Sequence, residues 1–300
     1  MKIVVAGGSG FLGRSIVREL IRGGHDVTVL SRKPDSVTRI QELRGANATR
    51  GDVTDPGSLA GSLEGADAVV NCVQFPNHPV EVPRKGLTYD RYDRQGTENL
   101  IAEALRSGTK RFLYLSGAGA DPTSDKSWYR AKGLAEGALR SSGLEWAIVR
   151  PSWAYGPGDR ALNRLAKMAR FLPVLPQLGM ANQRIQPVYV EDIALAVRRI
   201  FEREAWGQVF EIGGPKVMTM HEVLETLLEA MGKRRAILPI PAALAKAGTA
   251  PLVALSKPPM TPQGIEFAIQ DGLVDIQSLQ EVLGVTPLPL KEGLSRYIHA

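Results

Sequence analysis

The first thirteen residues join an apolar strand to a glycine turn, and this junction limits the fold more than any other part of the chain. Lys2–Ala6 is a run typical of a buried strand, and glycines 7, 10 and 13 follow it. Because glycine has no Cβ atom, such a turn can bring backbone very close to a ligand. Residues 14–22 then have the apolar spacing of an amphipathic helix, whose N-terminus points at the turn.

A strand, a glycine turn and a helix in this order indicate a binding site for the pyrophosphate of a dinucleotide. The alternative is a tight strand–helix turn that binds no ligand. We expect the dinucleotide to contact the turn and the helix start through Gly7, Gly10, Phe11, Leu12 and Gly13.

Length and composition fit a globular protein with a large core. The chain has 300 residues, of which 44% are hydrophobic and 23% charged. Its only cysteine, Cys72, excludes an internal disulfide framework, and its four histidines form no spaced ligand set, so we predict no metal site. No apolar run reaches the ~18 residues that a spanning helix needs. A strand begins at the first residues, which leaves no room for a targeting peptide, and we expect a cytoplasmic location.

The net charge of +6 permits an anionic partner. A phosphorylated cofactor, an anionic membrane surface and nucleic acid all qualify. Small cationic clusters occur at Arg198–Arg199 and Lys233–Arg235, but no nucleic-acid-binding module is recognisable, so we expect no nucleic-acid partner. A solvated surface is the simplest interpretation of the scattered charges.

Strand and helix patterns alternate through the first half of the chain. Strands are predicted at 26–31, 48–52, 68–73, 111–116 and 145–150, with helices near 56–64, 86–107 and 124–142. This order predicts an α/β fold with a doubly wound parallel sheet, the Rossmann architecture. Residues 1–155 would form the dinucleotide-binding core and 156–300 a smaller, mostly helical lobe. The segment at about 184–212, with a helix at 191–203 and a strand at 209–212, would return to the core.

The end of the second strand predicts which nicotinamide cofactor is preferred. An acidic residue there would bind the ribose hydroxyls of NAD(H). This chain instead has Ser31, Arg32 and Lys33, which suit the 2′-phosphate of NADP(H). After the third strand, Asp52 and Val53 are placed to contact the adenine, although Asp52 can equally be a turn cap. NADP(H) is therefore expected over NAD(H).

Several longer motifs resemble the extended and atypical branches of the short-chain dehydrogenase/reductase superfamily. They include the glycine turn, Gly51–Asp55, Tyr129–Lys132, Arg150–Asp159 and Gln186–Asp192. Segments in the last third, Met260–Gln263, Asp271–Gly272, Leu283–Pro287 and Tyr297–Ile298, resemble bacterial relatives of the NADPH-binding accessory subunit of respiratory complex I.

The superfamily resemblance implies a Tyr acid/base, a Lys four residues later and a Ser or Thr that orients the substrate. Lys132 matches the Lys, but Trp128 stands where the Tyr belongs, and Ala118 stands at the serine position. Tyr129 and Ser116 are the candidate replacements, since Tyr129 lies three residues before Lys132 on one helix.

The same resemblance assigns further contacts to the cofactor. Lys132 would hold the nicotinamide ribose, and the strand ends at Cys72, Val73, Pro151 and Ser152 would line the dinucleotide. Cys72 is expected to be buried filler, with a nucleophilic role as the alternative.

Three functions remain open at this point. The first is an NADP(H)-binding protein whose cofactor serves structure, sensing or assembly. The second is an NADPH-dependent reductase or epimerase that uses Lys132 and Tyr129 on a small carbonyl or quinone substrate. The third is an accessory protein of a respiratory complex or of the inner face of the membrane, indicated by the apolar, proline-rich stretch 236–260 beside Lys233–Arg235.

Overall fold

The computed structural model describes residues 1–180, 183–249 and 261–298. Met260 and the second half of the apolar stretch, residues 250–260, lie outside the described residues. None of the described helices is long and apolar enough to span a bilayer.

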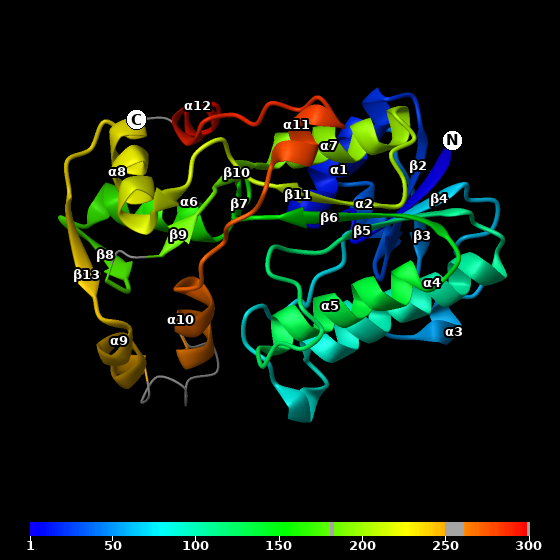
Figure 1. The fold of residues 1–300 in the computed structure, drawn as a ribbon, viewed down its shortest axis with the longest axis horizontal. Coiled ribbons are helices and arrows are strands. Elements are labelled where there is room, and N and C mark those ends of the chain that lie inside the picture. The colour runs from blue at the N-terminus through cyan, green and yellow to red at the C-terminus, as the bar shows by residue number, and fades with distance from the viewer. Residues whose placement is uncertain (181–182, 250–260, 299–300) are drawn as a thin grey trace.

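A parallel sheet of seven strands forms the centre of the molecule (Figure 1). Its spatial order is β11-β6-β5-β4-β1-β2-β3, and every neighbouring pair runs parallel. The strands are β1 (Lys2–Ala6), β2 (Asp26–Ser31), β3 (Asn47–Arg50), β4 (Ala68–Asn71), β5 (Arg111–Leu115), β6 (Glu145–Pro151) and β11 (Gln208–Ile212). The predicted doubly wound fold is confirmed. The strand order reverses between β1 and β4, which is where such sheets bind ligands.

Helices cover both faces of the sheet (Figure 1). One face carries α1 (Phe11–Arg22), α7 (Val190–Glu202) and α11 (Gln277–Glu281), with the short α2 (Pro34–Val37) near its edge. The other carries α3 (Pro56–Leu59), α4 (Gly96–Arg106) and α5 (Ser127–Arg140). A six-residue π-helix, η3 (Asp90–Gln95), leads directly into α4.

The remaining elements form a lobe beside the carboxyl ends of the strands (Figure 1). Its helices are α6 (Ala161–Phe171), α8 (Met220–Ala230), α9 (Ala242–Thr249), α10 (Pro262–Ala268) and α12 (Leu290–Ser295). Three small ribbons pair β7 (Ala154–Tyr155) with β10 (Val188–Tyr189), β9 (Arg184–Ile185) with β12 (Met218–Thr219), and β8 (Val174–Leu178) with β13 (Ala236–Ile240).

Three elements differ from the sequence-based expectations. The helix predicted near 56–64 ends at Leu59, because Ala60 is extended and Gly61 has a φ of +78°. The helix predicted from 86 starts later, because a 3₁₀ turn over Pro83–Lys85 ends at Gly86 with a φ of +64°. The lobe was expected to be mostly helical, yet Ala236–Ile240 is a strand that pairs with β8.

The packing of α1 between the sheet and α7 predicts a large stability effect. Leu20 is fully buried there, so Leu20→Ala should lower the free energy of unfolding by about 2–5 kcal/mol through lost burial and a residual cavity. Denaturant unfolding with an unchanged m-value measures this. The matched control is Leu105→Ala on α4, 51% exposed, which should change stability by about 0.5 kcal/mol or less. Equal effects of the two changes would contradict the packing.

Candidate functional site

The glycine turn lies against the end of β4, where only glycine fits. Gly7 has a φ of +76°, and a Cβ atom on it would lie 2.8 Å from the carbonyl carbon of Cys72. A Cβ atom on Gly13 would lie 2.3 Å from the Gly7 carbonyl oxygen. Both distances are shorter than real contacts allow, so side chains at 7 and 13 would push the turn, α1 and β4 apart.

The N-terminus of α1 is left open for an anion. Gly10 caps the helix in an extended conformation and, without a side chain, makes no capping hydrogen bond to the first N–H groups. The first turn of α1 contains no acidic residue either. Unmet N–H groups at the positive end of a helix dipole suit a pyrophosphate, and the cradle of Gly7, Gly10 and Gly13 leaves backbone room for one.

Two exposed cations follow β2. The Ser31 hydroxyl accepts a hydrogen bond from the Lys33 N–H at 3.1 Å, which holds the turn. The side chains of Arg32 and Lys33 are exposed, and no carboxylate of the described residues pairs with them. Both therefore remain available to an external anion at the end of β2.

Asp52 caps a turn, one of the two roles that its position allowed. Its Oδ1 accepts from the Thr54 N–H and the Thr54 hydroxyl, both at 2.9 Å, so it caps the turn after β3. No described residue bonds its Oδ2, which leaves an acceptor for a ligand. Val53 is buried, and its carbonyl oxygen accepts from the Asn99 amide at 2.8 Å.

At the end of β4 the backbone lies beside the glycine turn, and the thiol of Cys72 is unreactive. Burial raises the pKa of the Cys72 thiol to about 12, so the thiol stays protonated and is no nucleophile at neutral pH. The Asn71 side chain accepts from the Val73 N–H at 3.0 Å and donates to the Thr97 hydroxyl at 2.9 Å. These bonds fix the backbone of residues 71–73 beside Gly7.

Lys132 forms a buried ion pair that was not expected. Its Nζ lies 3.0 Å from Oδ1 of Asp93, whose side chain is fully buried. The ammonium also lies 5.6 Å from the centre of the Tyr114 ring. Burial by itself lowers the pKa of Lys132, but Tyr114 and Asp93 outweigh it and raise that pKa, so the ammonium stays charged.

Asp93 also ties two segments together. Burial raises the pKa of its carboxyl, and the Lys132 ammonium opposes that rise. Its Oδ2 accepts from the Phe75 N–H at 3.0 Å, just beyond the end of β4. Its carbonyl oxygen accepts from the Thr97 hydroxyl at 2.6 Å. One buried carboxylate therefore connects the loop after β4, the π-helix and the lysine of α5.

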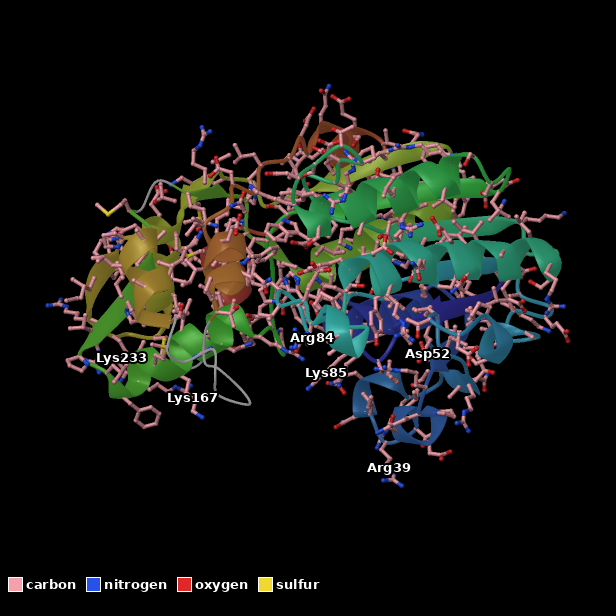
Figure 2. The ribbon with its side chains drawn as sticks, turned by 90° about the horizontal axis from the view of Figure 1, so that it is seen from below. Arg39, Asp52, Arg84, Lys85, Lys167 and Lys233 are labelled. Atoms are coloured by element: carbon pink, nitrogen blue, oxygen red, sulfur yellow. The ribbon has the colours of Figure 1, made fainter. Side chains whose placement is uncertain are left out.

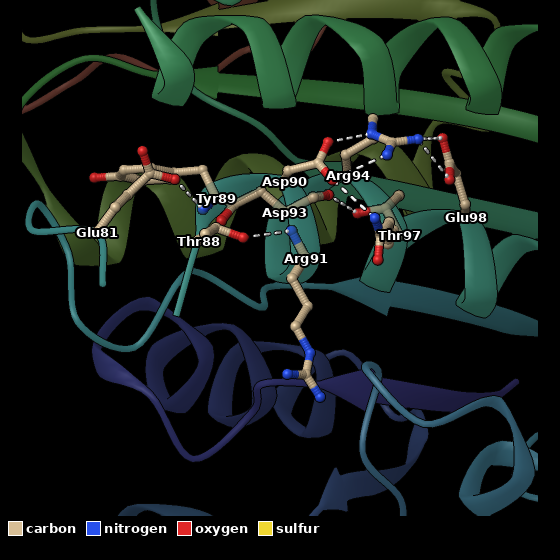
Figure 3. A network of polar contacts seen from close by, with 10 residues as sticks. Glu81, Thr88, Tyr89, Asp90, Arg91, Asp93, Arg94, Thr97 and Glu98 are labelled. Carbon is tan, nitrogen blue, oxygen red and sulfur yellow. Dashed lines mark hydrogen bonds and ion pairs between the residues drawn. The ribbon is translucent and has the colours of Figure 1, made fainter. Parts of the chain in front are cut away.

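Surface contacts surround this buried carboxylate on η3 (Figure 3). Arg94 bonds Asp90 and Glu98, and Glu81 accepts from the Tyr89 N–H at 2.8 Å. Figure 3 shows the Arg91 side chain pointing away from this network toward the blue N-terminal ribbon. π-helices are frequent at functional sites, and here one places Asp93 inward against Lys132.

The Ser116 hydroxyl is hydrogen-bonded to a buried carboxylate. Its hydroxyl donates to Glu136 at 2.7 Å, and Arg150 contacts the same carboxylate at 2.6 Å. Ala118 lies nearby in the chain, and its N–H donates to the Pro151 carbonyl oxygen at 3.0 Å. The hydroxyl of Ser116 thus has a structural partner inside the core.

Tyr129 and Lys132 lie on one helix, but no hydrogen bond or ring contact joins them. A Cβ atom on Gly119 would lie 2.8 Å from the Tyr129 ring, so this ring covers the turn after β5. Burial raises the pKa of the Tyr129 hydroxyl. The ring also lies 5.7 Å from Trp128 and has the Lys126 ammonium above it.

Trp128 belongs to an aromatic cluster under α10. The Trp128 and Phe267 ring centres are 5.6 Å apart, and Tyr89 packs at 6.3 Å. The His78 ring packs on Phe267 at 4.4 Å, and its Nδ1 lies 2.5 Å from the Tyr89 hydroxyl. Burial, then the nearby Lys132 and Arg160, lowers the pKa of His78 to about 4, so it is neutral at pH 7. An apolar, uncharged wall therefore stands beside Lys132.

The end of β6 contacts the last third of the chain. The Ser152 hydroxyl donates to the Gly272 carbonyl oxygen at 2.5 Å, and its N–H donates to Ile212. Pro151 closes β6 and pairs with Ile212 on β11. These contacts fix the strand end at which the nicotinamide was expected.

The sequence-based predictions missed Asp93, His78 and Phe267. A signal for Asp93 was present, because Tyr89, Asp93, Thr97 and Leu100 share one helical face. All four are buried. A carboxylate on an apolar helical stripe calls for a buried partner. No comparable local pattern points to His78 or Phe267.

Comparison with known proteins identifies the family. A family model described as NAD(P)H-binding matches residues 7–168, more than half of the chain. A mitochondrial NADH dehydrogenase [ubiquinone] 1 alpha subcomplex subunit 9 from Arabidopsis thaliana is 29% identical over 254 residues. The match spans 82% of this chain but only 62% of the plant protein.

Two further proteins support the same relationship. The 2-alkyl-3-oxoalkanoate reductase of Stenotrophomonas maltophilia is 30% identical over 265 residues, 78% of this chain and 77% of that protein. UDP-glucuronic acid 4-epimerase from Bacillus cereus, solved with UDP-glucuronic acid and NAD, shares the fold with a TM-score of 0.77 at 20% identity, over 99% of each chain. The epimerase shows the fold alone, but the resemblance drawn from the sequence is confirmed: the chain belongs to the NAD(P)H-binding family, and its relatives include a complex I subunit and a reductase.

Proposed function

We propose that this protein binds NADP(H) and retains it as a structural or sensing group instead of turning it over. The observation that carries the proposal is the ion pair of Lys132 with the buried Asp93. In the reductases that the sequence resembles, a Tyr hydroxyl and this Lys act together as acid and base. Here Trp128 replaces the Tyr, and the described contacts of Lys132 are Asp93 and the Tyr114 ring.

The proposed cofactor contacts follow the strand ends. Gly7, Gly10 and Gly13 with the start of α1 would hold the pyrophosphate. Arg32 and Lys33 would bind the 2′-phosphate, with Arg32 able to contact it through two N–H groups. When bound, the nicotinamide would supply hydride chemistry.

An active oxidoreductase is the second candidate, and one specific observation favours it. The relative from Stenotrophomonas maltophilia is named a reductase, and the match covers three-quarters of both chains. Tyr129 would then be the acid that protonates a carbonyl or quinone oxygen, after a movement that brings its hydroxyl to Lys132. The neutral aromatic wall of Trp128 and Phe267 suits an apolar substrate.

The proposed setting is the cytoplasm, in a protein assembly. The Arabidopsis relative is named a subunit of NADH dehydrogenase, which favours a protein partner over a freely diffusing substrate. Neither the sequence nor the relatives indicate a nucleic-acid partner.

Cofactor retention and turnover separate the two candidates. We expect purified protein to release NADP(H) only on unfolding, and to oxidise NADPH no faster with carbonyl or quinone acceptors than without them. Tyr129→Phe should then change neither the retention of NADP(H) nor the rate of NADPH oxidation. Absorbance and mass spectrometry of the released ligand, with an NADPH oxidation assay, measure this. Steady turnover that Tyr129→Phe reduces by about 10²-fold or more would establish the reductase instead.

The 2′-phosphate assignment predicts a change in cofactor choice. Arg32→Ala should weaken NADPH binding by about tenfold or more, since a charge-assisted hydrogen bond contributes about 1.5–3 kcal/mol. NADH binding should change little. Calorimetric titration of both cofactors into protein that has been unfolded, freed of its bound ligand and refolded measures the ratio, with Lys110→Ala, an exposed cation before β5, as the control. An equal loss for both cofactors would contradict this role of Arg32.

The buried pair predicts strong coupling between Asp93 and Lys132. Asp93→Asn leaves a buried ammonium without its anion and should destabilise the fold by about 3–5 kcal/mol. Lys132→Met added to it should recover part of that loss. A double-mutant cycle by denaturant unfolding should yield about 2 kcal/mol of coupling. Additive effects of the two changes would mean that the pair contributes nothing to the fold.

A further inference from the structure

The positive charge of the chain is concentrated in two segments. Residues 160–190 and 230–265 contain ten Lys or Arg and no Asp or Glu. The remainder of the chain has 27 Lys or Arg and 31 Asp or Glu. The excess of cations therefore belongs to these segments alone, and the rest of the protein is slightly acidic.

The fold brings the two basic segments together at the outer edge of the lobe. Strand β8 lies in the first segment and β13 in the second, and they pair in parallel from Val174 opposite Ala236 to Leu178 opposite Ile240. The last turns of α6 precede β8 and carry Lys167, while Lys233, Arg234 and Arg235 precede β13. Figure 2 shows Lys167 and Lys233 at the same end of the molecule, away from Asp52.

The outward face of this two-stranded ribbon is entirely apolar. Leu175 and Gln177 of β8 point inward and are almost fully buried. Side chains alternate along a strand and registered partners share a face. The outward set is therefore Val174, Pro176 and Leu178 with Ala236, Leu238 and Ile240.

Exposed apolar side chains continue this face on both sides. Phe171, at the end of α6, is 77% exposed, and Leu172 follows it. On β13 the exposed fraction of Leu238 is 56%, and on α9 that of Leu244 is 65%. Isolated exposed leucines are ordinary, but a contiguous apolar face with an exposed phenylalanine marks an interaction surface. We call this surface, residues 171–178 and 236–244 with their flanking cations, the ribbon face.

Two acidic residues of α8 lie beside the cations that precede β13. Glu225 and Glu229 of α8 line the hollow beside Lys233–Arg235. The Lys291 ammonium lies 2.7 Å from Glu229, and His221 lies 3.6 Å from Glu225. The net charge beside the ribbon face is therefore positive.

We infer that the ribbon face docks on the surface of an anionic phospholipid bilayer. Proteins bind the surface of such a membrane by inserting apolar side chains into the headgroup region. Lys and Arg around these side chains then contact the lipid phosphates. The long Lys and Arg side chains can reach the phosphates while their stems stay apolar. A second copy of the chain is a poor occupant, because it would set one cationic face against another.

Vesicle flotation with the full-length protein tests this inference. The protein should float with vesicles of phosphatidylcholine mixed with phosphatidylglycerol and not with phosphatidylcholine alone. High salt should release it, because salt screens the attraction between cations and phosphates. Equal binding to both vesicle types, or no binding to either, would overturn the inference, and the latter would leave a protein as the occupant of the ribbon face.

Variants on the ribbon face make the test specific. Leu238→Ser with Leu244→Ser should lower the vesicle partition coefficient by about tenfold or more, through lost apolar contact with lipid. Lys233→Glu with Arg234→Glu should lower it at least as much. The matched controls are Leu105→Ser on α4 and Lys110→Glu, which should change nothing.

The variants should keep the wild-type melting temperature and NADP(H) affinity, because their side chains lie away from the glycine turn. Retained vesicle binding in both paired variants would overturn the inference. This outcome is separate from the proposed function, which depends on the cofactor site alone.

Discussion

The contact of the glycine turn with the end of β4 is the constraint on which the rest of the site depends. A Cβ atom on Gly7 would meet the Cys72 carbonyl group, and one on Gly13 would meet the Gly7 carbonyl oxygen. These two close approaches bring α1, β1 and β4 together at the point where the strand order reverses. The helix N-terminus, Arg32 and Asp52 then all follow the carboxyl ends of neighbouring strands, the edge at which a doubly wound sheet forms its ligand crevice.

The buried pair of Asp93 and Lys132 changes what that crevice can do. A lysine beside a tyrosine hydroxyl lowers the tyrosine pKa and supports proton transfer. A lysine neutralised by a buried carboxylate has its charge satisfied within the protein, and its remaining N–H groups can only donate hydrogen bonds. Because Asp93 also holds the Phe75 N–H, the pair reinforces the wall of the crevice at the same time. This arrangement supports the proposed retention of the dinucleotide without turnover.

The ribbon face lies at the outer end of the lobe, away from Asp52 of the proposed cofactor site (Figure 2). Docking through the ribbon face would therefore keep the Asp52 side of the proposed cofactor site away from the bilayer. The charge distribution suits this arrangement, because the excess of cations in the chain belongs to residues 160–190 and 230–265, the two stretches that contain the strands of the ribbon face.

The sequence by itself determined the sheet, the glycine turn and the place of Arg32 and Asp52 just after β2 and β3, because backbone sterics and apolar spacing act between near neighbours. Only the tertiary structure decided the partners of Lys132, Ser116 and Trp128. Asp93 lies 39 positions before Lys132 in the chain, and Phe267 reaches Trp128 from a helix in the last third. The pairing of β8 with β13 joins segments about 60 positions apart. Such contacts follow from how whole layers pack, and no local pattern of residues specifies which distant side chain will fill a given place.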